Sequence, residues 1–257
     1  MNIPAHTTSL FDHVLLEVES GRIHEATFLL AGTLDGIVAA GGDAAEWREG
    51  LLQHPLATLL GDFAKGGDAV SENPLCRSGD GTDVLCASIA DLGFSRALAA
   101  RHDLAVDAMC KAWATGKSIW LADDASERLL DRMGWRNTDN IACSSDLLAV
   151  SDRVSYDLIV AIGTAPALGC AALEARLRAL FFSTAAGGTV LMASFVPGHS
   201  GHGWQMICNG LPLHCQDELT LRRSAMTAGF EITHFRDASN SLVWAILRRP
   251  LDGGCDE

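Results

Sequence analysis

The sequence predicts an α/β fold: a Rossmann-like, seven-stranded, doubly wound sheet with an N-terminal helical cap. Three observations support this prediction. From residue 83 onward, short apolar runs alternate with helical patterns, as in a parallel sheet that helices cover on both faces. Residues 156–198 contain a strand, a helix and a second strand in succession. Residues 9–62 carry helical patterns alone. We therefore expect a helical cap over 1–63, a glycine-rich lid or linker over 64–82, and a Rossmann-like domain over 83–257.

The helical cap is predicted from apolar spacing and from glycine stops. The first helix has one apolar face and ends near Gly21, since glycine takes left-handed dihedral angles without a Cβ clash. A longer helix follows and ends at Gly41–Gly42. Asp43 is the expected N-cap of a third helix. His54–Pro55 opens a short fourth turn. Three or four packed helices are therefore expected before residue 63.

The α/β part begins with three predicted strands. They are Asp83–Ile89, Lys117–Ala122 and Asn140–Cys143, and each is short and mostly apolar. Strongly helical patterns separate the first strand from the second, at 92–115, and the second from the third, at 126–133. The spacing is that of strands alternating with helices, which indicates a parallel sheet.

The central unit supplies the fourth and fifth strands. Leu158–Ile162 is a continuous apolar run, typical of a strand buried on both faces. Residues 171–184 have helical spacing, Gly187–Gly188 is the expected end of that helix, and Thr189–Phe195 is the next strand. A helix at 217–228 and an antiparallel pair at 230–235 and 241–247 complete the sheet.

Composition excludes several classes of partner. The chain has 19 Lys and Arg against 32 Asp and Glu, a net charge of −13, whereas nucleic-acid binding needs clustered cations. No apolar run reaches the roughly 18 residues of a membrane span, and the N-terminus has no signal-peptide pattern. The eight cysteines include no C-x-x-C pair, which favours reduced, structural thiols. We expect a cytoplasmic protein without membrane insertion; a homodimer is left open.

A pair of carboxylates follows the second predicted strand. Asp123 and Asp124 stand where doubly wound nucleotide folds place an acidic residue for the ribose hydroxyls. A carboxylate suits this role because it accepts two hydrogen bonds from a vicinal diol. The alternative role is to cap the following helix.

Here the sequence resembles a known family. Tyr-Asp-Leu-Ile-Val-Ala-Ile-Gly, from residue 156, and Gly-Gly-Thr-Val-Leu-Met-Ala-Ser-Phe-Val-Pro-Gly, from residue 187, resemble the fourth- and fifth-strand motifs of class I S-adenosylmethionine-dependent methyltransferases. The resemblance is stronger to the bacterial family that makes 3-hydroxypalmitic acid methyl ester, an extracellular factor. It extends to Cys-Gln-Asp-Glu-Leu and to Phe-Arg-Asp-Ala-Ser-Asn-Ser-Leu-Val-Trp near the C-terminus.

The resemblance implies S-adenosyl-L-methionine as cofactor and a set of binding residues. Such families have a glycine-rich turn after the first strand, where this chain has Cys86–Asp91, without glycine. Small residues there would still admit the cofactor. A rival alignment puts the turn at Leu121–Ser126. The implied cofactor-binding residues, including a lid aspartate, an adenine contact and a glycine after strand four, are Asp68, Ala87, Ser88, Asp91, Asp123, Asp124, Asp146, Leu147 and Gly163.

An acceptor site is expected just beyond the fifth strand. His199, His202 and Trp204 lie there, in a segment that also contains two glycines. Ligands of open α/β sheets bind at the carboxyl ends of the strands, so these side chains are candidate catalytic residues. The alternative is a solvated loop. A zinc site with His214 and Cys215 is conceivable by residue type, but the spacing matches no zinc pattern, so no metal is expected.

Three functions remain open from the sequence. The first is methyl transfer to a small-molecule acceptor, such as the carboxylate of a hydroxy fatty acid. The second is an intramolecular displacement on the same cofactor, which would release methylthioadenosine. The third is a degenerate, non-catalytic subunit, because the glycine turn is absent. Released nucleoside and cofactor affinity distinguish these three functions.

Overall fold

A computed structural model describes residues 5–60, 88, 91–135, 139–144, 155–208, 210, 213–236 and 240–251. The chain divides into two compact units. One contains residues 1–99 and 198–213, and the other contains 100–197 and 214–257. The expected boundaries near residues 63 and 83 fall in a stretch outside the described residues. Helix α7 (Gly93–Ala114) begins in the first unit and ends in the second.

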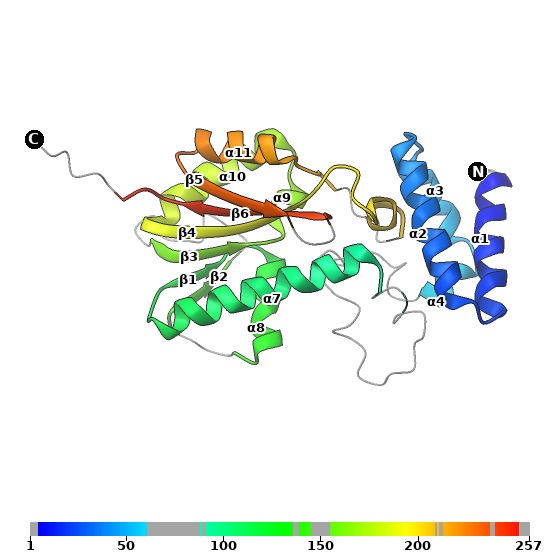
Figure 1. Cartoon of the computed structure of the whole chain (residues 1–257), viewed down its shortest axis with the longest axis horizontal. Coiled ribbons are helices and arrows are strands. Elements are labelled where there is room, and N and C mark those ends of the chain that lie inside the picture. The colour runs from blue at the N-terminus through cyan, green and yellow to red at the C-terminus, as the bar shows by residue number, and fades with distance from the viewer. Residues whose placement is uncertain are drawn as a thin grey trace, which may run out of the picture. The chain divides into compact units, whose positions relative to one another are not determined.

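The first unit contains four helices before residue 61. They are α1 (Ala5–Glu19), α2 (Ile23–Ala39), α3 (Ala44–Leu52) and α4 (Leu56–Leu60) (Figure 1). The predicted stops are confirmed, because Gly21 and Gly41 have φ of +79° and +78°. The Asp43 side chain accepts hydrogen bonds from the Ala45 and Glu46 amides, which confirms the predicted N-cap. That these helices cap the sheet stays a prediction.

The second unit is built on a six-stranded sheet. Its strands are β1 (Ile119–Leu121), β2 (Ile141–Cys143), β3 (Tyr156–Ala161), β4 (Thr184–Phe195), β5 (Glu231–Arg236) and β6 (Leu242–Arg248), in the order β2-β1-β3-β4-β6-β5. The first four are parallel, and β6 runs antiparallel to both β4 and β5. The closing antiparallel pair is confirmed. Of the expected strand at 83–89, only Ser88 is described, and it is helical.

Helices cover the sheet on both faces, as the apolar runs predict. Helices α7 and α8 (Asp124–Met133) lie on one face, and α10 (Cys170–Ser183) and α11 (Glu218–Thr227) on the other (Figure 1). Successive strand residues point to opposite faces, so both sides of each central strand are buried. The α10 face buries Trp120, Ile159, Ala161, Val190 and Met192, and the α7 face buries Ile119, Leu121, Leu158, Val160 and Leu191.

The glycine pair before the fifth predicted strand has a different role from the one expected. Helix α10 ends at Ser183 and β4 begins directly at Thr184, so Gly187 and Gly188 lie within the strand. The β3–β4 register shifts here, because β4 advances from Thr184 to Thr189 while β3 advances only from Tyr156 to Leu158. A Cβ on Gly188 would lie 2.9 Å from the Tyr156 carbonyl oxygen. The glycines therefore permit a bulge.

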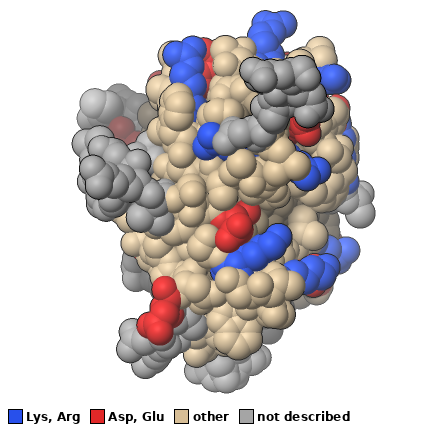
Figure 2. All heavy atoms as spheres, turned by 90° about the vertical axis from the view of Figure 1, so that its left-hand side faces the viewer, with Lys and Arg blue, Asp and Glu red and all other residues tan. Residues whose placement is uncertain are grey.

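Surface charge is uneven. On the face drawn in Figure 2, Lys and Arg side chains are at least as prominent as Asp and Glu, although the net charge is −13. The acidic excess is therefore not spread equally over every face. Among the described residues, no helix is long and apolar enough to cross a membrane.

The α10 face of the sheet supplies a stability test. Leu177 on α10 is 0% exposed, whereas Leu219 on α11 is 73% exposed. We expect Leu177→Ala to lower the free energy of unfolding by about 2–5 kcal/mol, because it removes buried apolar surface and leaves a cavity. The matched change Leu219→Ala should cost about 0.5 kcal/mol or less. Urea denaturation of both variants checks this, and similar losses would contradict the packing described.

Candidate functional site

The strand order defines where a ligand should bind. The chain passes from β1 to β2 on one side and then to β3 on the other side of β1, so the direction of winding reverses between β1 and β3. In open α/β sheets, ligands bind outside the carboxyl ends of the strands at such a switch point. The turn after β1 is Ala122–Ser126, and the turn after β3 begins at Ile162. The strand order thus favours the rival alignment.

Asp123 joins these two turns. It is the N-cap of α8, and its Oδ1 accepts from the Ser126 amide at 2.9 Å and the Ser126 hydroxyl at 2.7 Å. Its Oδ2 accepts from the Gly163 amide at 2.9 Å and the Thr164 hydroxyl at 2.8 Å. Each carboxylate oxygen therefore already accepts two hydrogen bonds, which leaves none of its lone pairs for a ribose diol.

Two arginines fix the same turns from opposite faces of the sheet. Arg101 of α7 is fully buried and donates to the Ile162 carbonyl oxygen at 3.1 Å. Burial lowers the pKa of the Arg101 guanidinium to about 10, and the nearby Asp123 carboxylate opposes that shift. Arg176 of α10 donates to the Ala122 carbonyl oxygen and lies over the Trp120 ring. The switch point is therefore a closed, charged network.

Gly163 is close to protein rather than to an open crevice. A Cβ at this position would lie 2.8 Å from the Ala125 Cβ and 3.4 Å from Asp123 Oδ1. The glycine is thus required for the β3 turn to pack against the start of α8. The expected contact of Gly163 with a cofactor stays a prediction.

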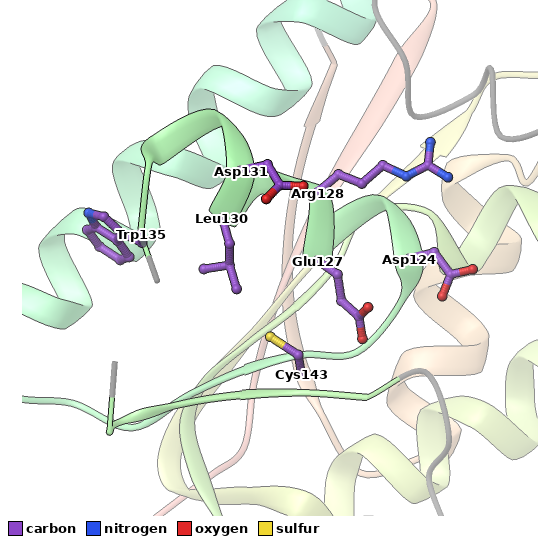
Figure 3. Close-up of a pocket in the computed structure, with 7 residues that line it drawn as sticks. All are labelled: Asp124, Glu127, Arg128, Leu130, Asp131, Trp135 and Cys143. Carbon is purple, nitrogen blue, oxygen red and sulfur yellow. The ribbon is translucent and has the colours of Figure 1, made fainter. Parts of the chain in front are cut away.

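An acidic groove begins beside the switch point at Asp124 and follows α8, with Cys143 at the end of β2 on its other side. Its volume is about 690 Å³, within the usual range for small-molecule sites. In Figure 3, Glu127, Leu130 and Cys143 surround the same space, with Trp135 at one end and Asp124 at the other. The lining residues that the structure describes belong to α8, the residues after it, or β2: Asp124, Glu127, Arg128, Leu130, Asp131, Trp135 and Cys143.

The surroundings of this groove disfavour the ionised forms of Glu127 and Cys143. Burial raises the pKa of the Glu127 carboxyl, and the negative charges of Asp124 and Asp123 raise it further. Burial, followed by the charge of Glu127, raises the pKa of the Cys143 thiol, so this thiol is protonated at neutral pH. Cys143 is therefore not an activated nucleophile. Asp124, unlike Asp123, is exposed at the first turn of α8.

The candidate acceptor residues His199, His202 and Trp204 belong to the helical unit. Trp204 opens a short π-helix, Trp204–Cys208, and is 1% exposed with its ring centroid 6.2 Å from that of Phe94. His199 is 4% exposed, and its ring stacks on His202 at 5.3 Å. The segment is therefore packed rather than a solvated loop.

Asp35 of α2 holds this segment. Its carboxylate accepts from the Gly201 amide at 2.6 Å and the Gly203 amide at 2.7 Å. Burial raises the pKa of Asp35, while these amides and His202 oppose the increase. Burial lowers the pKa of His202, and Asp35 opposes that decrease. A Cβ on Gly203 would lie 2.1 Å from the α2 backbone, so only glycine fits.

Of the remaining expected cofactor residues, only Ser88 and Asp91 lie in the part of the chain that the structure describes. Ser88 is helical, so the expectation that it belongs to the first strand is wrong, and its hydroxyl lies 3.0 Å from His24 Nδ1. Asp91 pairs with Arg96 at the start of α7, 3.2 Å apart. Four expected residues lie outside the described part of the chain: Asp68, Ala87, Asp146 and Leu147.

Sequence patterns did not point to three residues of these sites. Arg101, Glu127 and Asp35 each lie inside a helix, where a charged residue is usually solvated. For one of the three, Arg101, the sequence contained a signal of burial: it follows an apolar stretch of α7 and lies on the buried side of that helix. In the described part of the chain, no group of three or more His, Cys, Asp or Glu side chains is arranged to hold a metal ion.

Comparison with solved structures supports the fold. The chain is similar to a possible exported protein from Bordetella parapertussis, with a TM-score of 0.56 and 16% identity, over 90% of this chain and 98% of that one. No protein-family model matches the chain, and no curated protein matches it in sequence.

Several other similar structures are S-adenosylmethionine-dependent methyltransferases. Magnesium protoporphyrin IX methyltransferase from Synechocystis PCC 6803, with bound SAH, has a TM-score of 0.43 and 12% identity, over 69% of this chain and 93% of that one. Human N-acetylserotonin methyltransferase, in complex with SAM, has a TM-score of 0.38 and 12% identity, over 79% of this chain and 69% of that one.

The Asp123 network leads to a stability prediction. We expect Asp123→Ala to lower the free energy of unfolding by about 3–5 kcal/mol, because it removes four hydrogen bonds and the carboxylate beside buried Arg101. The neighbouring change Asp124→Ala should cost about 0.5 kcal/mol, since that side chain is exposed. Urea denaturation with the two variants in parallel checks this. Equal effects would mean that Asp123 does not hold the two turns together.

The contact between Gly163 and Ala125 is open to a double-mutant cycle. Gly163→Ala should cost about 1–3 kcal/mol through overpacking against the Ala125 methyl. Ala125→Gly should cost about 1 kcal/mol through lost helix propensity. The double variant should lose clearly less stability than the sum, because each change relieves the other. Additive losses, measured by thermal or urea unfolding, would show that the two positions do not touch.

Proposed function

We propose that the protein is an S-adenosylmethionine-dependent methyltransferase that acts on a small-molecule acceptor. The observation that carries this proposal is the acidic, partly aromatic groove between α8 and the end of β2, which begins next to the switch point of the sheet. Its chemistry suits the cofactor, which combines a flat base, a vicinal diol and positive charges. The sequence resemblance and the α/β fold support the same class.

The cofactor fits the groove better than it fits the switch point. At the switch point, Asp123 and the Ala125–Gly163 contact fill the space between the turns, so this turn does not suit the methionine end of the cofactor. In the groove, the carboxylates of Asp124 and Glu127 can accept hydrogen bonds from the ribose hydroxyls. Leu130 and Trp135 supply the apolar surface for the base. We therefore place the cofactor in the groove.

The bound cofactor supplies a methyl group that is already activated on a sulfonium centre. The protein then has to bind the cofactor and the acceptor, orient them toward each other and exclude water from the site. A carboxylate acceptor, such as that of a hydroxy fatty acid, needs no base. For an alcohol or amine acceptor we propose His202, because burial lowers its pKa and so keeps the imidazole neutral and able to accept a proton. His199 and Trp204 would support its ring. We also propose that the protein is cytoplasmic.

One observation favours a second candidate function. The turn after β1 has no glycine, and its Asp123 side chain is fully engaged by the protein. Such a closed turn would suit a protein that holds the cofactor in a different conformation and releases methylthioadenosine, or a subunit without catalytic activity.

A calorimetric titration with S-adenosylmethionine tests the proposal. We expect micromolar binding to the full-length protein, followed by release of S-adenosylhomocysteine when an acceptor is supplied. Release of methylthioadenosine would replace methyl transfer by the intramolecular reaction. Absence of heat and of any thermal shift at millimolar cofactor would overturn the enzymatic proposal. His202→Gln should slow transfer to an alcohol or amine at least tenfold without altering cofactor affinity, whereas the exposed control His13→Gln should change neither.

A further inference from the structure

Asp35 holds the backbone on both sides of one candidate catalytic residue. Its Oδ2 accepts from the Gly201 amide at 2.6 Å and its Oδ1 accepts from the Gly203 amide at 2.7 Å, with His202 between these two glycines. Hydrogen bonds to an ionised group are shorter and stronger than neutral ones. Helix α2 and this segment belong to the same compact unit. The backbone of His202 is therefore fixed to α2.

The far end of the same segment is fixed to α3. Arg48 donates to the carbonyl oxygens of Ile207 and Cys208, at 2.9 Å and 2.7 Å. These carbonyls lie at the end of the short π-helix. A Cβ on Gly210 would lie 2.5 Å from the Arg48 guanidinium, so the chain beyond the π-helix also packs closely against this side chain. Asp35 and Arg48 thus anchor opposite ends of one short segment.

Stacking fixes the side chain of His202 as well. Its ring lies on that of His199, with the centroids 5.3 Å apart and an angle of 29° between the planes. His199 Nδ1 lies 2.8 Å from the Ser200 carbonyl oxygen, and because a carbonyl oxygen accepts, this nitrogen carries the proton and donates it there. His199 is buried, whereas His202 is partly exposed. Of the two imidazoles, that of His202 is the one that an acceptor can reach.

Among the described residues, the charge that acts on the His202 ring is the carboxylate of Asp35. It opposes the decrease that burial causes in the pKa of His202. Within the same part of the chain, no lysine or arginine contributes to the pKa shift of either residue, and Arg48 is bound to carbonyl oxygens at the other end of the segment. An acceptor beside the imidazole therefore meets a negative charge, which repels a carboxylate but not a neutral alcohol. The same charge stabilises the imidazolium once His202 has taken up a proton.

We propose that Asp35 is a positioning residue of the acceptor site, and that it makes this site take a neutral alcohol or amine rather than a carboxylate. Under the proposed function, on which this inference rests, His202 is the base for such acceptors, so the inference selects between the acceptors that the function leaves open. In the transfer, the acceptor oxygen or nitrogen bonds to the methyl carbon, and the methyl–sulfur bond breaks with its electron pair on sulfur. The acceptor proton goes to the His202 imidazole and from there to water.

Two probes of similar shape test the charge preference. Benzyl alcohol is neutral and benzoate carries a negative charge, and each is titrated into the full-length protein at neutral pH. The imidazole NMR signals of His202, identified by their loss in His202→Gln, report binding. We expect benzyl alcohol to bind the wild type about tenfold more tightly than benzoate. In Asp35→Asn this ratio should fall below about threefold, and in the exposed control Glu25→Gln, also on α2, it should stay as in the wild type.

The titration of His202 separates positioning from a merely structural role. If Asp35 acts on the imidazole, Asp35→Asn removes the opposing charge, so the pKa of His202 should fall further below its ordinary value. If Asp35 only packs the segment, its loss should expose the ring to water and raise that pKa toward the ordinary value, which would overturn the inference. Amide exchange at Gly201 and Gly203 should accelerate about tenfold in Asp35→Asn and stay unchanged in Glu25→Gln.

Failure of the inference and failure of the proposed function give different results. Wild-type protein that binds benzoate as tightly as benzyl alcohol, or whose His202 signals respond to neither probe, would overturn the inference, even if Asp35→Asn does not fold. The calorimetric titration with S-adenosylmethionine decides about the methyltransferase separately. Without cofactor binding the proposed function fails, whereas a preference for benzyl alcohol that is lost in Asp35→Asn would keep this segment as a site for neutral ligands.

Discussion

The closure of the switch point by one carboxylate is the constraint on which the site depends. Asp123 caps α8 with one oxygen and binds the turn after β3 with the other, so it joins segments that lie 40 residues apart in the chain. Arg101 lies buried beneath the same turns and Arg176 binds them from the opposite face. Because each group completes the hydrogen bonding of another, loss of one would leave a buried charge or amide unsatisfied, which is costly.

This closure determines where a ligand can bind. In doubly wound sheets the crevice at the switch point is the usual binding place. Here that crevice is filled by Asp123, by the Ala125 methyl and by the close approach of Gly163. Among the described residues, a concave surface lies beside it, along α8, where Asp124 and Glu127 make no side-chain hydrogen bond to another described residue. Of the two adjacent aspartates, Asp123 is thus engaged within the protein, and Asp124 is the one that we propose for binding.

In the helical unit, too, a partly buried carboxylate joins segments that lie far apart in the chain. Asp35 binds two glycine amides of the segment 198–208, and Gly203 lies so close to α2 that a side chain would collide with it. His199 and His202 stack within this packed segment, and burial of His202 favours its neutral form. The sequence left open whether this histidine pair is catalytic or part of a solvated loop. The structure packs it instead within hydrogen bonds and neighbouring side chains.

The sequence by itself determined most of the secondary structure. Apolar spacing, the stops at Gly21 and Gly41 and the cap at Asp43 act within a few residues, so the local pattern contains the information needed. The order of the strands, the partners of Asp123 and the neighbours of Gly163 were decided by tertiary structure. The sequence could not assign the turn after β1 to the switch point, since that depends on which strands pair across the sheet. Nor could it identify Glu127, because the raised pKa of a helical carboxylate arises only when burial and neighbouring charges act on it together in the folded chain.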